Sequence, residues 1–203
     1  MSPGAASYQL GTISYGFPAD RQRLARLRSH LSADRLVKEM DEHDEPRKIS
    51  AAEYRKRAQR TIRIARRLGF AGRVEYRHVY SRSGGAQYYI GPSAVDDLLV
   101  VYGEAFERDA DPADFSLDAL IAHECGHQQL VRNSALRTIV AKLPGERFEE
   151  VLASLVGSLL VGEPSSAQTL VWKATAELGQ LRISPGNTVD FIERLRRLLR
   201  DLL

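Results

Sequence analysis

The sequence contains 203 residues, the size of one domain or of one domain with an appended segment. Hydrophobic residues make up 43% of the chain and charged residues 27%, which excludes a disordered protein and allows a substantial core. The one cysteine, Cys125, excludes an intramolecular disulfide and a multi-cysteine zinc site, and it weakly favours a reducing compartment.

Charge is distributed unevenly along the chain. Residues 1–75 contain 16 lysines and arginines against 9 acidic residues, a net charge of +7, whereas residues 76–203 contain 13 against 17, a net charge of −4. A basic N-terminal part could contact nucleic acid, but no recognition motif accompanies it. The simpler interpretation is an arginine-rich, solvated helix surface, and nucleic acid is not an expected partner.

Neither a targeting segment nor a membrane span is expected. Residues 1–16 lack the basic residues and apolar run of a signal peptide. The longest nearly apolar stretch, Val151–Gly162, is shorter than the about 20 residues that cross a bilayer. We therefore expect a cytoplasmic protein without a membrane partner.

The N-terminal quarter is predicted to be separate from the rest. Residues 1–18 have no clear periodicity, whereas Asp20 to about Met40 has leucines at helical spacing. The charged stretch 41–46 ends in proline and indicates a linker. We divide the chain into residues 1–48, a helical arm or regulatory segment, and residues 49–203, the main domain.

The main domain is predicted to begin with one helix and then a small sheet. A serine cap with a glutamate three residues later predicts a helix from Ser50 to about Leu68. Alternating side chains predict a strand over Val74–Tyr80, a hairpin turn over Ser81–Gly85 and a returning strand over Gln87–Ile90. Leu98–Tyr102 is apolar on both faces and predicts a third strand.

The rest of the chain is predicted to be helical after an acidic loop. Helical spacing of apolar residues predicts four helices, over Phe115–Asn133, Pro144–Val161, Ser165–Leu178 and Thr188–Leu203. Helices, a small sheet and then helices indicate an α+β fold.

The pentapeptide His123-Glu124-Cys125-Gly126-His127 lies within the first of these four helices. A helix turns about 100° per residue, so the two histidines lie one turn apart on one face, where they can hold one Zn²⁺ ion. Glu124 lies beside that face and can act as general base toward a zinc-bound water. Ser116 is a favourable helix cap, and Cys125 is expected to pack in the core.

A third protein ligand is expected on the next helix. Glu150 lies at the edge of an apolar stripe, where a carboxylate needs a partner that a metal ion would supply. Glu149 is the alternative, and both glutamates could instead be solvated. We predict a site with His123, His127 and Glu150 as metal ligands and Glu124 as catalytic residue.

An HExxH motif followed by a glutamate on the next helix resembles the gluzincin metallopeptidases, and HECGH in a short chain is most similar to the ImmA/IrrE-type family. The resemblance covers residues 74–162 and implies a zincin-like fold: a small antiparallel sheet, an active-site helix and a helical C-terminal half. Two positions depart from the family pattern. Leu152 replaces a glutamate, and Ser154 replaces the Asn or Asp that supports a histidine ligand, which puts metal affinity in doubt.

The resemblance also implies that an edge strand pairs with an extended substrate. Leu98–Tyr102 is the candidate strand, and a plain core strand is an equally good interpretation of it. An oxyanion stabiliser is expected among Tyr88, Tyr89, Tyr102 and His78, although these side chains could simply pack.

Two functions follow from the sequence. The first is a zinc-dependent endopeptidase that hydrolyses a protein or peptide, such as a regulatory protein, with Glu124 as general base. The alternative is a non-catalytic, metal-containing module that binds protein or nucleic acid. A third possibility combines the two: residues 1–48 form a regulatory arm that covers the active-site cleft and is removed or displaced on activation.

Overall fold

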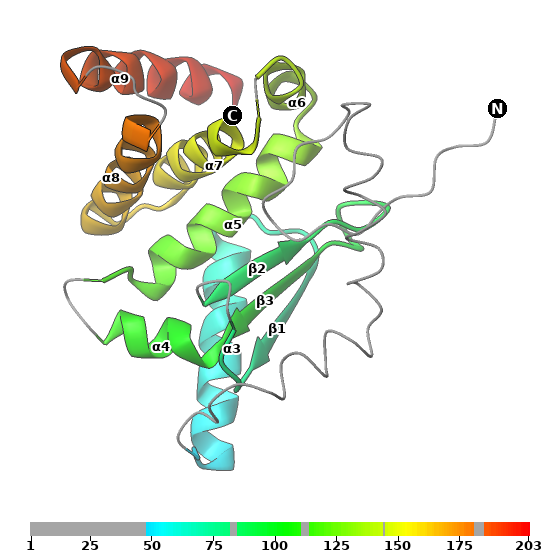
Figure 1. Cartoon of the computed structure of the whole chain (residues 1–203). Coiled ribbons are helices and arrows are strands. Elements are labelled where there is room, and N and C mark those ends of the chain that lie inside the picture. The colour runs from blue at the N-terminus through cyan, green and yellow to red at the C-terminus, as the bar shows by residue number, and fades with distance from the viewer. Residues whose placement is uncertain (1–47, 82–84, 111–113, 144, 181–184) are drawn as a thin grey trace.

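Figure 1 shows the computed structural model, which describes residues 48–81, 85–110, 114–143, 145–180 and 185–203. The predicted helix Asp20–Met40 and almost all of the predicted arm, 1–48, lie outside these residues. The described part has an α+β fold of seven helices and three strands. Its elements are α3 (Ala51–Arg67), β1 (Arg73–Arg77), β2 (Ala86–Tyr89), β3 (Leu98–Tyr102), α4 (Gly103–Asp109), α5 (Leu117–Arg132), α6 (Ser134–Val140), α7 (Glu146–Leu160), α8 (Pro164–Gln180) and α9 (Pro185–Leu202).

Helix α3 begins as its capping signal predicts. The side chain of Ser50 accepts a hydrogen bond from the backbone N–H of Glu53 at 3.1 Å. The helix ends at Arg67, and the N–H of the following residue, Leu68, donates to Ile64 O. Its buried residues Ile64 and Ala65 contact the hydrophobic core, so α3 is fixed to the main domain.

The three strands form a mixed sheet in the order β1-β3-β2, so the prediction of an antiparallel sheet is wrong. Strand β3 pairs in parallel with β1 and antiparallel with β2. Side-chain alternation identifies strands but not their partners. The strand that is apolar on both faces takes the centre, because there both faces and both edges are covered.

This order also corrects the hairpin and edge-strand predictions. Strands β1 and β2 are not neighbours, so they do not form a hairpin. Residues on both sides of the predicted turn contact the end of β3 instead: the N–H of Gly103 donates to Val79 O at 3.1 Å, and the N–H of Tyr102 donates to Gly85 O at 2.8 Å. Because β3 is central, it has no free edge for a substrate, and the edges belong to β1 and β2.

Helix α5 lies between two hydrophobic cores (Figure 1). On one side, Leu117 and Ile121 pack with α3 and one face of the sheet. On the other side, Leu130 packs with apolar residues of α6, α7, α8 and α9. A helix between two cores is buried over most of its length, so any polar residue on it needs an internal partner.

The four long helices predicted for the second half are confirmed, with bounds shifted by a few residues. Two short helices were missed: α4, within the predicted acidic loop, and α6, each of seven residues. Helices this short bear too few apolar residues to show a period. None of the helices in the described ranges is long and apolar enough to cross a membrane.

Candidate metal centre

Helix α5 positions the HECGH motif. Ser116 caps the helix, as predicted, by accepting from the N–H of Ala119 at 3.1 Å. About two to three turns after this cap, His123, Glu124 and His127 are all buried. Cys125 packs in the core between α5 and the sheet, as expected for a residue that is not a ligand.

Two glycines let α5 and α7 approach closely at this point. A side chain at Gly126 would overlap the carbonyl group of Ala153, whose carbon would lie 2.9 Å from the added Cβ. A side chain at Gly157 would lie 2.6 Å from the carbonyl oxygen of Ala122. Packing therefore explains the glycine inside the motif, because its lack of a side chain lets the glutamates of α7 lie against the two histidines.

The structure brings His123, His127 and Glu150 together, with one candidate ligand atom of each within 4.8 Å of the others. Glu150 Oε2 lies 3.1 Å from His123 Nε2, and Glu150 Oε1 lies 3.3 Å from His127 Nε2. Ligand atoms at the corners of a tetrahedral zinc site with bonds of 2.0–2.1 Å lie about 3.3 Å apart. The separations between histidine and glutamate atoms therefore suit one small ion.

Each histidine has a polar side chain next to its Nδ1 atom, through a hydrogen bond for His123 and a longer contact for His127. Ser154 Oγ lies 3.1 Å from His123 Nδ1, and Glu149 Oε1 lies 3.4 Å from His127 Nδ1. Both Nε2 atoms consequently face Glu150. Ser154 thus occupies the supporting position despite its shorter side chain, and Glu149 contacts the back of a histidine instead of converging with the three candidate ligands.

Several buried polar atoms of this cluster lack a hydrogen-bond partner among the described residues: Glu124 Oε2, both ring nitrogens of His127, Glu149 Oε2 and Glu150 Oε1. Buried polar atoms are normally paired, and an unpaired one costs about 1–3 kcal/mol. A divalent ion bound to His127 and Glu150 would remove two of these deficits. The residues present therefore fit a metal ion.

The electrostatics of the metal-free cluster favour an ionised Glu150 beside a protonated His127, whereas His123 is neutral. Burial alone would raise the pKa of Glu150, but the contacts with His123 and His127 hold it well below its usual value. Burial would lower the pKa of His127, yet the carboxylates of Glu149 and Glu150 raise it. The pKa of His123 is lowered by burial and by the nearby charge of Lys173. His123 is therefore neutral at pH 7, the form that binds metal.

Glu124 differs from the other two glutamates of the cluster. Burial raises its pKa to about 7, with opposing contributions from the charge of His127 and from a backbone hydrogen bond with Tyr88. A carboxyl group with a pKa near the working pH is suited to accept and return a proton. Of the predicted site residues, Glu124 is thus the one whose environment suits acid–base work.

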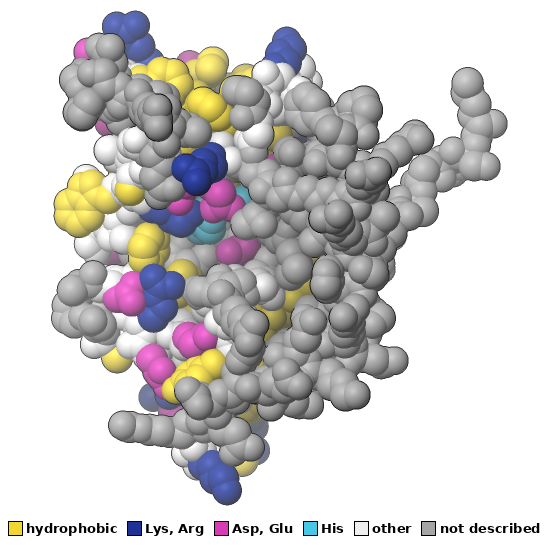
Figure 2. Space-filling view, viewed as in Figure 1, with side chains coloured by type: hydrophobic (Ala, Val, Ile, Leu, Met, Phe, Trp, Pro, Cys, Tyr) yellow, Lys and Arg dark blue, Asp and Glu magenta, His cyan; other side chains and the backbone are white. Residues whose placement is uncertain are grey.

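Lys173 of α8 also belongs to the cluster, although the sequence analysis did not single it out. Its Nζ lies 2.8 Å from Glu150 Oε2 and 3.4 Å from His123 Nε2. Figure 2 shows histidine side chains on this face with acidic and basic side chains gathered beside them. No local pattern connects residue 173 with residue 123, because the contact depends on how α8 packs on α7.

The predicted oxyanion stabilisers have other contacts. The hydroxyl of Tyr88 donates to Asp97 at 2.9 Å. The hydroxyls of Tyr89 and Tyr102 both donate to Gln87 Oε1, at 2.6 and 2.7 Å. His78 Nδ1 lies 2.9 Å from the hydroxyl of Tyr76. Tyr89 also interacts electrostatically with Glu124, although its hydroxyl donates to Gln87.

Replacing Gly126 by alanine is expected to destabilise the fold by about 1–3 kcal/mol, because α5 and α7 must separate to accommodate the methyl group. Gly179→Ala is the matched control, since nothing lies within 4 Å of its added Cβ and alanine is the better helix former. Urea unfolding of both variants measures the difference. Equal stabilities would show that the close approach is not required.

Replacing Ser154 by alanine is expected to weaken metal binding by about tenfold or more, because His123 loses the group that orients its ring. Ser158→Ala is the control, because its hydroxyl is also buried on α7 but donates to Leu155 O at 2.7 Å. Competition with a zinc chelator measures both affinities. If Ser158→Ala loses as much zinc affinity as Ser154→Ala, the loss comes from a general packing effect.

Comparisons with known proteins give no relative that could assign the site. No protein-family model matches the chain, and neither a curated protein nor a solved structure matches it. The case for a function therefore rests on the residues of the cluster and their geometry.

Proposed function

We propose that the protein is a cytoplasmic zinc-dependent peptidase with His123, His127 and Glu150 as metal ligands and Glu124 as general base. One observation carries the proposal: both Nε2 atoms and the Glu150 carboxylate converge, while Ser154 and Glu149 lie next to the Nδ1 atoms of the histidines. Two histidines and one glutamate form a ligand set of hydrolytic zinc sites, which leaves one position for water.

In the proposed hydrolysis of a peptide bond, the ligand residues and Glu124 have different roles. A zinc ion at the three ligands would lower the pKa of a water molecule to about 7 and so supply hydroxide at neutral pH. Glu124 accepts the proton of that water and returns it to the leaving nitrogen of the peptide. Its burial and its pKa of about 7 allow both steps.

The edge strand β2 is the proposed place for the substrate. It packs against α5, and the backbone of Tyr88 hydrogen-bonds Glu124, so β2 lies beside the proposed general base. An extended peptide that adds to this edge would place its backbone next to Glu124. This assignment replaces the central strand β3, whose two edges are both occupied.

The test combines metal analysis with peptide hydrolysis. The purified full chain should bind about one zinc per molecule, and His123→Ala and His127→Ala should abolish that binding. The zinc-loaded protein should cleave members of a mixed peptide library, and removal of zinc by 1,10-phenanthroline should stop cleavage until zinc is added back. Full activity in a metal-free preparation would overturn the proposal.

One contact favours the non-catalytic alternative. The ammonium of Lys173 already pairs with Glu150, so the carboxylate has a cationic partner without a metal ion. On that alternative, the cluster is a buried ion-pair network and the chain binds a partner protein. A zinc titration tests this metal-free form of the alternative, because a pure ion-pair network takes up no stoichiometric zinc. A metal-containing, non-catalytic module would bind zinc but leave the peptide library uncleaved.

A further inference from the structure

We propose that Lys173 is a catalytic residue, the donor that stabilises the negative charge on the carbonyl oxygen of the scissile bond. The inference rests on the proposed peptidase function and names a residue that the HExxH pattern does not include. Nζ lies 2.8 Å from Glu150 Oε2 and 3.4 Å from His123 Nε2, on the side where the ligand atoms of α5 and α7 converge. The ammonium therefore lies where the reaction would occur, and not behind the ligands as Ser154 and Glu149 do.

The packing of α8 explains this position. Leu170, Ala174 and Leu178 are completely buried one turn apart and hold the helix against α7. Lys173 immediately precedes Ala174, so it leaves the helix at the border of the buried stripe. Its side chain is 25% exposed, whereas that of its neighbour Trp172 points outward and the residue is 64% exposed. A lysine at this border keeps its stem against protein and its ammonium in the site.

Lys173 interacts with three groups of the proposed machinery. Besides Glu150 and His123, it interacts electrostatically with Glu124. A divalent ion bound to Glu150 would neutralise part of the carboxylate charge, which weakens the ion pair with Lys173. The positive ion would also repel the ammonium. The flexible four-carbon stem of lysine would let Nζ turn from Glu150 toward the carbonyl oxygen of a bound peptide.

The proposed step balances without a further reactant. The water oxygen forms a bond to the carbonyl carbon, and the π electron pair moves to the carbonyl oxygen. Lys173 donates a hydrogen bond to that oxygen and keeps its proton, while Glu124 carries the water proton to the nitrogen. The electron pair on the oxygen then re-forms the C=O bond as the C–N bond breaks. The second water proton, left on the new carboxyl group, passes to the released amine, so the products are a carboxylate and an ammonium. A hydrogen-bond donor directed at the developing charge contributes about 10²–10³-fold in rate.

The competing candidates have hydroxyls engaged elsewhere. Tyr88 donates to Asp97, and Tyr89 and Tyr102 donate to Gln87. Among the described residues of the cluster, Lys173 alone brings a nitrogen with several protons to donate.

The test compares Lys173→Met, which removes the charge, with Lys173→Arg, which keeps it, in the full-length chain. Lys56→Met on α3 is the control, because that lysine is exposed and its helix contributes no residue to the cluster. On a peptide that the wild-type protein cleaves, Lys173→Met should lose about 10²–10³-fold in kcat with KM changed only a few-fold. Lys173→Arg should recover part of the loss, and Lys56→Met should match the wild type.

Two readouts besides turnover separate catalysis from structure. Chelator competition should show that Lys173→Met binds zinc at least as tightly as the wild type, since a cation beside the site has been removed. The affinity for a phosphonamidate analogue of the cleaved peptide should fall in parallel with kcat/KM across the Lys173 variants, as a group that acts on the transition state requires.

Every other result rejects the proposal. Unchanged kcat in Lys173→Met would reject Lys173 while the peptidase function stands. Loss of zinc from Lys173→Met would assign the lysine to holding Glu150 in place. A wild-type protein that binds zinc but cleaves nothing would reject the function and with it the role of Lys173. If Lys173→Met does not fold, as judged by circular dichroism, full activity of Lys173→Gln would reject the proposal.

Discussion

Replacing Glu124 by glutamine is expected to reduce peptide hydrolysis by about 10²–10⁴-fold and to leave one zinc ion bound per chain. Glutamine keeps the shape of the side chain but cannot accept the proton of the attacking water. The fold should tolerate the change, because burial raises the pKa of Glu124 to about 7 and a neutral side chain is already favoured below that pH. The measurement is kcat/KM together with zinc content.

Glu104→Gln is the matched control for this variant. Glu104 is also a partly buried glutamate with a raised pKa, caused first by burial, and its Oε2 has no hydrogen-bond partner among the described residues. It lies on α4, and its Oε1 accepts from the N–H of Ser81 at 2.6 Å, outside the metal cluster. Hydrolysis by Glu124→Gln as fast as by the control would contradict the role of Glu124, whereas joint loss of zinc and activity would assign it to metal binding.

The sequence predicted the part of the site that depends on helical period. Spacing on one helix determines that His123 and His127 share a face, and an apolar stripe indicated which glutamate of the next helix is partly buried. The contact of Lys173 could not be predicted, because it depends on the packing of α8 on α7. The same limit applies to Glu149, whose contact with His127 depends on how closely the two glycines let α5 and α7 approach.

Secondary structure was more predictable than strand pairing for a similar reason. The alternation of Val74 and Tyr76 is a local property and correctly indicated a strand. A short Gly-rich segment between two strands is typical of a hairpin, yet β3 is inserted between β1 and β2. Only the tertiary competition for the buried central position decides that order, and the strand that is apolar on both faces takes it.

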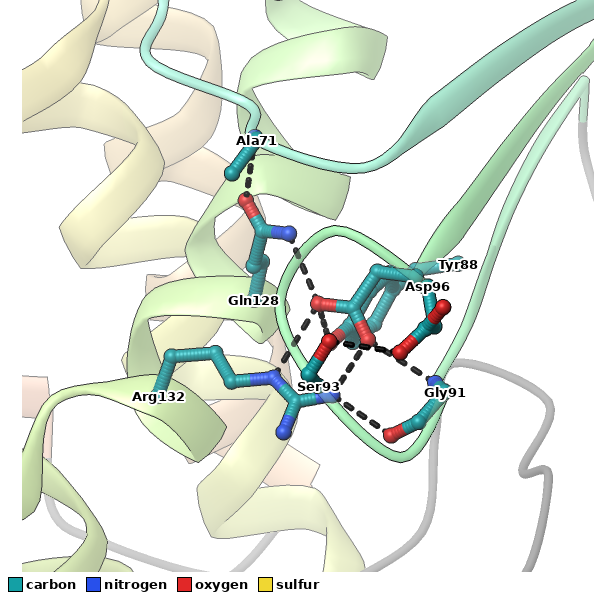
Figure 3. A network of polar contacts seen from close by, with 8 residues as sticks. Ala71, Tyr88, Gly91, Ser93, Asp96, Gln128 and Arg132 are labelled. Atoms are coloured by element: carbon teal, nitrogen blue, oxygen red, sulfur yellow. Dashed lines mark hydrogen bonds and ion pairs between the residues drawn. The ribbon is translucent and has the colours of Figure 1, made fainter.

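Replacing Asp97 by alanine is expected to destabilise the fold by about 3–5 kcal/mol, the cost of breaking a buried ion pair by removing one partner. Asp97 is completely buried, and its carboxylate pairs with Arg132, with Oδ1 2.5 Å and Oδ2 3.1 Å from the guanidinium nitrogens. Figure 3 labels Arg132 and other residues of this network. It also accepts from the hydroxyl of Tyr88 at 2.9 Å, the N–H of Gly91 at 2.8 Å and the amide of Gln128 at 2.7 Å. Alanine leaves all these donors without their acceptor.

The control for this variant is Asp96→Ala. Asp96 precedes Asp97 but is exposed and accepts from the hydroxyl of Ser93, so its loss should cost no more than about 0.5 kcal/mol. Urea unfolding of the metal-free proteins measures both variants. Equal free energies of unfolding for the two variants would show that the Asp97 network does not stabilise the fold.

The Asp97 network also connects the sheet to the proposed metal site. Gln128 follows His127 directly, and its side chain bridges Asp97 and the N–H of Ala71, the latter at 3.3 Å. Loosening this connection lets the C-terminal half of α5 move, so Asp97→Ala should also bind zinc more weakly. Zinc at a concentration of about 100 times its Kd raises the free energy of unfolding by about 2.7 kcal/mol in a protein that binds zinc only when folded. Saturating zinc should therefore recover much of the lost stability of Asp97→Ala, whereas a variant of Asp97→Ala that also lacks His127 should recover none.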